Sequence, residues 1–559
     1  MSLFGALHVG QSGISTSNNA LNTTAHNLSN IETEGYVRQQ VLQSDRVYHN
    51  IGSAAIAPKQ SGLGVVYSKV RQVRDEFLDA AYRKEAGREN FYSTCYEVTN
   101  ELEVFLGELQ GASFKDSLTN LWTAVEELQK DPSSGVTEGQ FVSQASQFLE
   151  RAQAVYQGLS DYQDNLNEKI KDMVDTINEY GQKICDYNSW ISKIELSSEE
   201  ANDLRDARNK LLDELGAYGN LTYKEDIKGE VTAIFEGVPF VNPGQNTPFK
   251  MDVGYMLDDG SYKKDRQGDP STGFYTPIWP AYGNTPVFDV NQEISSKKNT
   301  NIGELKALVL ARGDRRADYT DVEDPIYNEG SDKLASTANS IIMNAQAEFD
   351  QLIHKVVTEV NNILTGEKDQ IDSGKTPSYS DEESEPKELF VRLGTERYTS
   401  DTHTYIPENT LVSQTMYSCK NLKINQELLK EPTLLGYPDK SFTTADKNVD
   451  QTKADRLAEA FSTAGLTLNP NVTKESNFVD LYSDMVGAMG TAGYIYKTVS
   501  DSQNTTVGSI DSSRQQIMGV SSNEELQNMI KFQNAFNASS RYFNTINEMI
   551  DHILNRLGG

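Results

Sequence analysis

A chain of 559 residues is too long for one hydrophobic core, so its length predicts roughly three or four domains. Its 81 acidic and 51 basic residues leave a formal net charge of −30, which argues against nucleic acid or an anionic membrane as a partner. The sequence contains no apolar run of about 18 residues, so no insertion into a membrane is predicted.

The first predicted helix lies within residues 1–40 and carries a seven-residue repeat. One heptad position is apolar, whereas the second is small or polar in most of its occurrences. Such a pattern predicts a helix that needs a partner along its length, with a seam too poor in apolar surface to hold the helix alone. The residues are Leu7, Ile14, Leu21 and Leu28 at the first position, and Gly10, Ser17, Thr24 and Ile31 at the second.

A turn and an extended segment follow this helix. Asn30 and Gly35 are turn residues, and residues 37–41 are expected to be extended. The segment resembles the N-terminal signature of bacterial flagellar axial proteins (rod, hook and hook-associated proteins), in which Asn-Leu-Ala/Ser-Asn precedes Thr-Pro-Gly-Tyr and a basic residue. Glu34 replaces the proline, so the turn is less restricted here. From the heptad alone, an ordinary amphipathic helix with a glycine turn fits equally well. The residues that match the signature are Asn27, Asn30, Gly35, Tyr36 and Arg38.

Residues 41–68 are rich in Gly, Ser and Ala and predict a loop with short strands. Residues 62–66 begin like a dinucleotide-binding fingerprint, but Tyr67 replaces its third glycine, so this segment is interpreted as a connector before a helix. Together with residues 75–78, it resembles a second block of the axial family.

Three long helical patterns come next. Apolar residues step by three and four over residues 91–109, 114–128 and 148–194. The third pattern would extend ~70 Å at about 1.5 Å per residue, and it slips once near Leu166, as an eleven-residue repeat requires. Residues 131–135 form the turn before it. The aromatic residues on these stripes are predicted to be core residues rather than cofactor ligands.

Residues 201–215 are dense in charge and predict a helix that ends at Gly216, with Leu204, Leu211 and Leu215 turned inward. The charged side chains are expected on a solvated outer face rather than around a bound cation. This block and the turn at 131–134 resemble one branch of the axial family, the subunits that join the hook to the filament.

The pattern of apolar residues changes after Gly216. Residues 217–300 predict a β-rich insertion, helix returns at 301–305 and over about 334–363, and residues 366–469 form a second mixed insertion. Asp318, Asp321 and Asp324 lack the glycine and the terminal glutamate of an EF-hand, so calcium is not indicated.

Two helical patterns end the chain. The first has a stripe of Phe478, Leu481, Met485, Ala488, Ala492, Ile495 and Val499. Gly519 ends it, and residues 521–525 begin the second. The stripe of the second helix is wide, so this helix must contact more than one neighbour, and we expect it to pair with the N-terminal helix. One heptad face has Leu526, Met529, Phe536, Phe543, Ile550, Leu554 and Leu557, and Phe532, Tyr542 and Ile546 lie beside it.

Catalytic motifs are absent from the sequence. Its six histidines are scattered, with no HExxH or Gly-x-Ser-x-Gly pattern. Cys95, Cys185 and Cys419 are too few and too far apart for a disulfide or zinc framework. No enzymatic activity, cofactor or metal is predicted.

The sequence therefore predicts a mainly α fold with β-rich insertions (α+β). Residues 1–60 and 516–559 form a terminal assembly domain, and residues 61–225, 300–365 and 470–515 form a long-helix domain. Residues 226–299 and 366–469 are the two inserted domains.

The resemblance implies a structural subunit of the bacterial flagellum that forms a junction ring between hook and filament. It implies as partners other copies of the chain, neighbouring hook and hook-associated subunits, and a cytoplasmic export chaperone on the C-terminal helix. The N-terminus lacks a cleavable signal peptide, which alone predicts a cytoplasmic protein. The resemblance instead implies an extracellular protein exported without cleavage. Two alternatives are another axial subunit (hook or distal rod), and a secreted coiled-coil adhesin or enzyme with its site in the inserted domains.

Overall fold

The computed structural model describes residues 3–46, 49–50, 60–61, 64–107, 113–197, 199–257, 259–290, 292–322, 337, 339–436 and 451–557. The chain divides into two compact units. Unit 1 comprises residues 1–89, 176–250 and 502–559, and unit 2 comprises residues 90–175 and 251–501. Most described residues are helical and the sheets are small, so the predicted fold class is confirmed.

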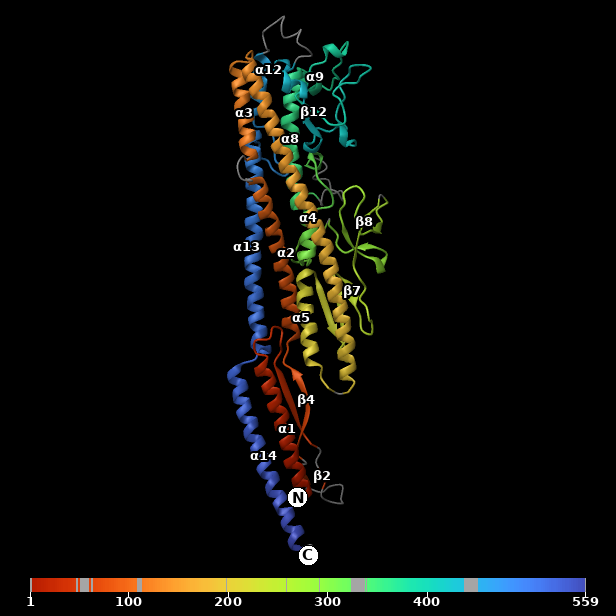
Figure 1. The fold of residues 1–559 in the computed structure, drawn as a ribbon, viewed down its shortest axis with the longest axis vertical. Coiled ribbons are helices and arrows are strands. Elements are labelled where there is room, and N and C mark those ends of the chain that lie inside the picture. Colours follow the sequence, from red (N-terminus) through yellow and green to blue (C-terminus); the bar gives the residue numbers. More distant parts are fainter. Residues whose placement is uncertain are drawn as a thin grey trace. The chain divides into compact units, whose positions relative to one another are not determined.

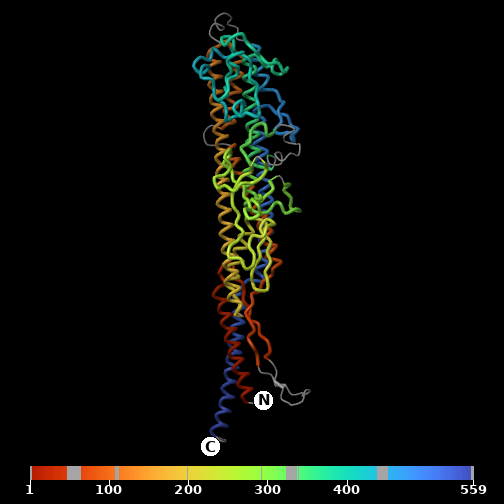
Figure 2. The backbone as a smooth tube through the Cα atoms, turned by 90° about the vertical axis from the view of Figure 1, so that its right-hand side faces the viewer, coloured from red at the N-terminus to blue at the C-terminus, as the bar shows by residue number. Residues whose placement is uncertain are grey.

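The two ends of the chain lie together in unit 1. Helix α1 (Leu3–Ser29) runs beside helix α14 (Ser522–Leu557), as the red and dark blue segments show in Figures 1 and 2. Strands β1 (Gln39–Asp45) and β4 (Val65–Gln72) form an antiparallel hairpin that also packs on α1. The short strands β2 (His49–Asn50) and β3 (Gln60–Ser61) pair within the same hairpin.

The rest of unit 1 is built around helix α5 (Asn202–Tyr218) and the start of α2 (Glu76–Gly107). The end of α4 (Gly135–Glu195) packs against a three-stranded antiparallel sheet of β5 (Leu221–Glu225), β6 (Val231–Phe235) and β7 (Val238–Val241). A Cβ at Gly181 in α4 would lie 2.3 Å from Cζ of the buried Phe240 ring, so only glycine allows this approach.

Unit 2 contains the hydrophobic core of the long helices. Aromatic rings of α3 (Phe114–Lys130), α4, α8 (Ile341–Thr365) and α13 (Phe478–Met518) meet there. The Phe114 ring centroid lies 5.5 Å from that of Phe148, 4.9 Å from Phe349 and 4.8 Å from Tyr482, and all four side chains are buried. Helices α6 (Glu304–Arg312) and α12 (Gln451–Ser462) pack on α8.

The sheets of unit 2 are short. Strands β8 (Asp252–Met256), β9 (Tyr262–Lys264), β10 (Thr276–Trp279) and β11 (Thr285–Pro286) pair in the order β11-β10-β8-β9. The region 366–436 holds α9 (Lys368–Asp372), α10 (Gln426–Lys430) and the pair β12 (Phe390–Arg392) and β13 (Leu422–Ile424). The segment predicted as one β-rich insertion thus contributes β5–β7 to unit 1 and β8–β11 to unit 2, while the predicted four-part division stays a prediction.

The helices follow most of their predicted patterns, and the differences are these. Helix α5 ends at Tyr218 rather than at Gly216. Helix α4 covers 61 residues, more than the apolar stripe indicated. Val65 begins a strand rather than a connector, whereas residues 62–63 lie outside the described residues. Leu334 also lies outside them, and α8 begins at Ile341. On α13, Ile495 is 54% exposed and Met489 is buried, because a straight helix drifts away from a strict heptad.

In the described ranges, no helix combines the length and apolar character that crossing a bilayer requires.

Candidate functional site

The terminal helices pair in an antiparallel register that several contacts define. Near the end of α1, Asn27 Nδ2 donates to Glu525 Oε2 over 3.2 Å. A Cβ at Gly13 would lie 2.5 Å from Ser539 Oγ, and a Cβ at Gly10 would lie 3.2 Å from Phe543 Cβ. Residue numbers fall along α1 as they rise along α14, so the helices run in opposite directions.

Small and polar residues make the buried face of α1, so the second heptad position faces α14. Their small size allows the two helices to approach closely. Ile31 lies beyond the end of α1 and is 43% exposed, because the helix ends at Ser29. The apolar heptad residues flank the seam and are half-buried, namely Leu7, Ile14, Leu21 and Leu28. The buried residues are Ala6, Gly10, Thr16, Ser17, Ala20, Thr24 and Asn27.

Helix α14 carries apolar residues on more than one face. The inner face, toward α1, has the half-buried Met529, Phe532, Phe536, Phe543 and Ile550, and the buried Ile546. A second set of apolar side chains remains exposed in the single chain. These exposed fractions are 45% for Leu526, 60% for Ile530, 40% for Tyr542, 49% for Met549, 40% for Ile553 and 65% for Leu554. The side chain of Leu557 lies outside the described residues.

The signature turn converges on the side chain of Asn27. Its Oδ1 accepts from Gln39 N (3.0 Å) and from the Tyr36 hydroxyl (2.8 Å), while its Nδ2 donates to Gln39 O (2.9 Å) and to Glu525. Burial, and then the nearby carboxylates of Asp203, Asp206 and Glu525, raise the pKa of Tyr36, so its hydroxyl remains a donor. Asn27 therefore joins α1, β1 and α14 with one side chain.

Two other signature residues shape this turn. Asn30 ends α1 through its backbone N–H and its side chain, which both donate to His26 O. Gly35 has a φ of +80°, a conformation that favours glycine. Glu34, in the place of the family's proline, forms an ion pair with Lys210 of α5 over 2.9 Å.

Arg38 links the ends of two helices. Its backbone N–H donates to Met518 O, the end of α13, over 2.8 Å. Its guanidinium pairs with Glu525 (Nε to Oε1, 2.9 Å) and with Glu524 (Nη1 to Oε2, 3.0 Å) in the first turn of α14. The Glu525 side chain is 3% exposed and receives donors from both Arg38 and Asn27, so this buried carboxylate is paired.

The signature turn docks on polar residues of α5. Val37 N donates to Asp206 Oδ2 (3.1 Å), and Gln72 Nε2 donates to Asp206 Oδ1 (2.6 Å). Burial raises the pKa of Asp206 to about 7, although these hydrogen bonds and nearby Arg74 act in the opposite direction. Gln72 Nε2 also donates to Asn202 O over 2.8 Å.

The prediction of a solvated charged face on α5 is wrong. Asp206, Arg208 and Asn209 are buried, whereas Leu204 and Leu211 are only half-buried. The charges are buried because each meets a partner from another segment, as a buried charge requires. Periodicity marks apolar faces and gives no sign of such partners.

A second cluster of buried charges holds α2, α5 and the end of α13 together. Arg514 pairs with Asp79 (Nη2 to Oδ1, 2.8 Å) and with Asp213 (Nη2 to Oδ2, 2.7 Å). Asp79 also pairs with Arg74, and Asp213 with Arg83 (Nε to Oδ1, 2.6 Å). The charged groups of Asp79, Arg83 and Arg514 are almost completely buried. Sequence reasoning missed this cluster, because bonded partners such as Asp79 and Arg514 lie 435 positions apart.

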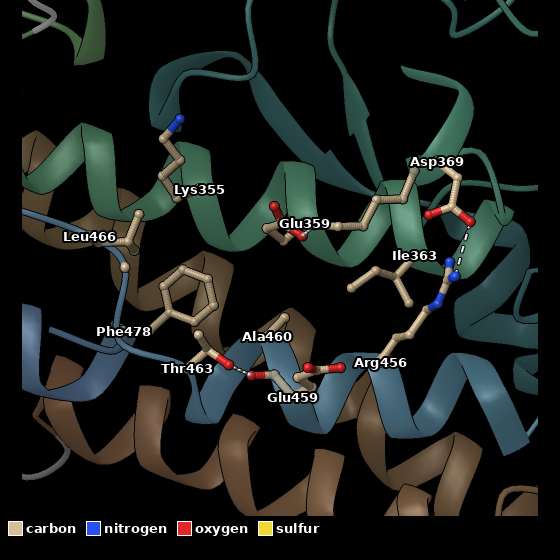
Figure 3. Close-up of a pocket in the computed structure, with 12 residues that line it drawn as sticks. Lys355, Glu359, Ile363, Asp369, Arg456, Glu459, Ala460, Thr463, Leu466 and Phe478 are labelled. Atoms are coloured by element: carbon tan, nitrogen blue, oxygen red, sulfur yellow. Dashed lines mark hydrogen bonds and ion pairs between the residues drawn. The ribbon is translucent and has the colours of Figure 1, made fainter. Parts of the chain in front are cut away.

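Unit 2 contains a cavity of about 440 Å³ between α8 and α12, shown in Figure 3. Its floor includes Ile363 and Phe478, and its rim has the ion pair between Arg456 and Asp369, at 2.9 Å. Lys368 and Glu359 form a second pair on the rim. A cavity with an apolar floor and paired charges on its rim is better suited to binding an apolar side chain than to catalysing proton transfer. Among the described residues, His, Cys, Asp and Glu form no group that could hold a metal ion.

Comparisons with known proteins agree with this architecture. The model of the flagellar hook-associated protein FlgK helical domain matches residues 99–375, and that of the flagellar basal body rod FlgEFG protein C-terminal region matches residues 512–557. Flagellar hook-associated protein 1 of Bacillus subtilis (strain 168) is 23% identical over 563 residues, which cover 100% of this chain and 99% of that protein. Its counterpart in Salmonella typhimurium is 24% identical over 593 residues, covering 97% and 98%.

A solved structure shares the fold. The flagellar hook junction protein FlgK from Burkholderia pseudomallei aligns with a TM-score of 0.51 at 14% identity, covering 79% of this chain and 100% of that one. The matches and the paired terminal helices define a structural subunit of the bacterial flagellum, of the axial class. Within that class, the chain belongs to the flagellar hook-associated protein 1 family.

Proposed function

We propose that this chain forms a ring that joins the flagellar hook to the filament, and that the terminal helices assemble it. Its role is structural rather than catalytic. Its partners are further copies of the chain and the adjoining hook and hook-associated subunits, and its place is outside the cell. The match to the family supports this proposal of partners.

The large apolar side chains that α14 leaves exposed are the observation that carries this proposal. Pairing with α1 covers the inner face and leaves Ile530, Met549 and Leu554 between 49% and 65% exposed. A soluble monomer rarely leaves such a series of large apolar side chains on one helix in water. Because they lie on different sides of α14, more than one further helix is expected to cover them. In a ring, those helices belong to neighbouring subunits.

We further propose export as an unfolded chain, without a cleaved signal, and with a cytoplasmic chaperone bound to α14. Before assembly, the apolar side chains of α14 lack their partners and favour aggregation. A chaperone that covers the inner face would have to leave before α1 can pair, because α1 occupies that face in the folded chain.

Charge substitutions at the exposed and at the inward apolar positions of α14 separate assembly from folding. Ile530→Asp combined with Ile553→Asp places charges at two exposed apolar positions on different sides of α14, so we expect the monomer to fold and filaments to be lost. Asn534→Asp combined with Asn544→Asp adds the same two charges at exposed polar positions and should keep filaments. Attached filaments are counted by electron microscopy in cells that depend on each variant, and circular dichroism checks the purified chain. Normal filaments with the double variant would contradict the proposal.

The inner face gives the complementary test. Phe536→Asp combined with Phe543→Asp should abolish both incorporation into the ring and binding of the chaperone, because these rings pack toward α1. The fold of unit 2 should survive, since neither residue belongs to it. Limited proteolysis would report that fold, and a double variant that still assembles would refute the proposed seam.

A further inference from the structure

Unit 2 presents an apolar loop that the proposed function does not use. We call residues 409–415 the Leu411 loop, and the side chain of Leu411 is 92% exposed. Leu393, which is 56% exposed, lies close by, because a Cβ at the next residue, Gly394, would lie 3.1 Å from Gln414 Cβ in this loop. Large apolar side chains that lie together on a surface indicate a contact with another molecule.

Hydrogen bonds hold the Leu411 loop in one conformation. Asn409 Oδ1 accepts from Leu411 N over 3.0 Å, and Asn409 O accepts from the N–H of Val412, which is 39% exposed, over 2.8 Å. Thr415 Oγ1 accepts from Asn409 N (2.9 Å) and donates to Asn409 O (3.0 Å), which closes the loop. The buried Asn421 side chain donates to backbone oxygens at its far end. A side chain held in this way loses little conformational entropy when it binds.

The cavity of Figure 3, which we call the α8–α12 pocket, has a complementary character. Its volume of about 440 Å³ lies within the range of roughly 300–1,000 Å³ that is usual for binding pockets, and Ile363, Leu466 and Phe478 point into it. Basic and acidic side chains line it in equal number, so their formal charges cancel. They are Lys355, Lys368 and Arg456, and Glu359, Asp369 and Glu459. An uncharged apolar group can enter this pocket without disturbing that balance, whereas a charged one cannot.

The Leu411 loop and the α8–α12 pocket are two different surfaces of unit 2. His354 of α8 faces the segment that leads into the loop, since its Nδ1 lies 3.6 Å from Glu408 Oε1. At about 100° per residue, Glu359 and Ile363 lie ~140° and ~180° farther around the same helix, where they line the pocket. A contact between two different surfaces of one chain repeats from copy to copy, and it generates a ring where the rotation closes.

We propose that the Leu411 loop of one subunit binds in the α8–α12 pocket of the next subunit, with Leu411 and Val412 on its apolar floor. Residues 409–419 contain no charged side chain, although 24% of the chain is charged. Copies that each carry a net charge of −30 repel one another, so contact between them is favoured where both surfaces are neutral, as the loop and the pocket are. This inference rests on the proposed ring, and it adds a contact between copies of unit 2 to the contact that the terminal helices make.

Disulfide cross-linking in assembled flagella tests this contact. Leu411→Cys is combined in the full chain with Ala460→Cys, whose position lines the pocket. The control pair combines Leu411→Cys with Ser462→Cys, at an exposed position of α12 that lies ~200° around the helix from Ala460. The native cysteines are buried, so they should not react. After mild oxidation, flagella are isolated from cells that depend on each variant, and non-reducing gel electrophoresis separates single chains from linked copies.

The expected result is a ladder of linked copies for the pocket pair and single chains for the control pair. Val412→Asp, added to the pocket pair, should weaken the ladder several-fold, because it brings a charge onto an apolar floor. Gln414→Asp adds the same charge at an exposed polar position of the loop and should keep the ladder.

Single chains alone from the pocket pair, in flagella that keep their filaments, would overturn this inference and leave the proposed function standing. Equal ladders from both pairs would also overturn it, because the cysteines would then meet by random collision. A link from Ala460→Cys to a different flagellar subunit would overturn it as well and assign the pocket to that subunit. A parent chain that attaches no filament would refute the proposed function itself, and this inference with it.

Discussion

Replacing a glycine in the seam between α1 and α14 should distinguish the effect of close helix packing on stability from the effect of helix propensity. A Cβ at Gly10 would lie 3.2 Å from Phe543 Cβ, and 3.3 Å from both Phe543 Cα and Tyr542 Cδ1. One of these atoms belongs to the backbone of α14 and cannot rotate away. A Cβ at Gly5, in the same helix, would meet nothing within 4 Å. Gly5→Leu is therefore a matched control for Gly10→Leu.

Both substitutions gain the same local term, since leucine favours a helix over glycine by about 0.8 kcal/mol. Gly5→Leu should therefore stabilise α1. Gly10→Leu must also push two helices apart, and overpacking of this kind costs about 1–3 kcal/mol. The difference between the variants is this overpacking cost, which corresponds to a roughly 5- to 150-fold larger opening constant for the helix pair in Gly10→Leu.

Native-state hydrogen exchange measures that constant peptide by peptide. Peptides from α1 and from residues 526–550 should exchange faster in Gly10→Leu than in Gly5→Leu, and peptides from unit 2 should exchange alike in both. Equal protection of α1 in the two variants would refute the close approach at Gly10.

Three further predictions concern residues of unit 1, and the control for the last of them, Gly139, lies in unit 2. Burial raises the pKa of Asp206 to about 7, so its contribution to stability is present below its unfolded value near 3.8 and is lost as the pH rises to 7. Asp206→Asn should flatten this fall, of at most about 1.4 kcal/mol per pH unit, in urea unfolding followed from about pH 5 to 8. Asp79→Asn leaves the buried Arg514 and the half-buried Arg74 short of a carboxylate and should destabilise unit 1 by about 3–5 kcal/mol, measured as a lower urea midpoint. Gly181→Ala forces a Cβ against Phe240 and should lower the melting temperature, whereas Gly139→Ala, with its nearest atom at 3.8 Å, should raise it.

The sequence predicted those features that depend on neighbouring residues. The apolar stripe of α4 is predicted by the spacing of nearby residues, and the turn at 131–134 by its local turn residues. Both are found in the structure. The pairing of the chain ends followed from two heptad patterns that lacked other partners. The stripe of α13 was misplaced by one residue at Met489, because a strict heptad ignores the 3.6-residue period of a straight helix.

Contacts between distant polar residues could not be predicted in this way. Asn27 and Glu525 are 498 positions apart, and nothing in the spacing around either residue indicates the other. The charges of α5 were placed in solvent for the same reason, although Asp206 and Arg208 are buried against partners from other segments. The resemblance to the family marked the signature residues without giving their contacts.

The polar residues of the signature turn fix the register of α1 against α14. They are needed for this because the seam between the two helices buries little apolar surface. The buried face of α1 is small and polar, so sliding α14 by one heptad would change little of the apolar area that the pair buries. A buried hydrogen-bonded carboxylate penalises such a slip, because a shifted Glu525 would lose Asn27 and Arg38 and remain buried without partners. Gly10 and Gly13 act in the same direction, since larger residues would replace them at the points of closest approach. The seam can thus be weak in total free energy and still specific in register, which suits helices that form their final contacts only in an assembly.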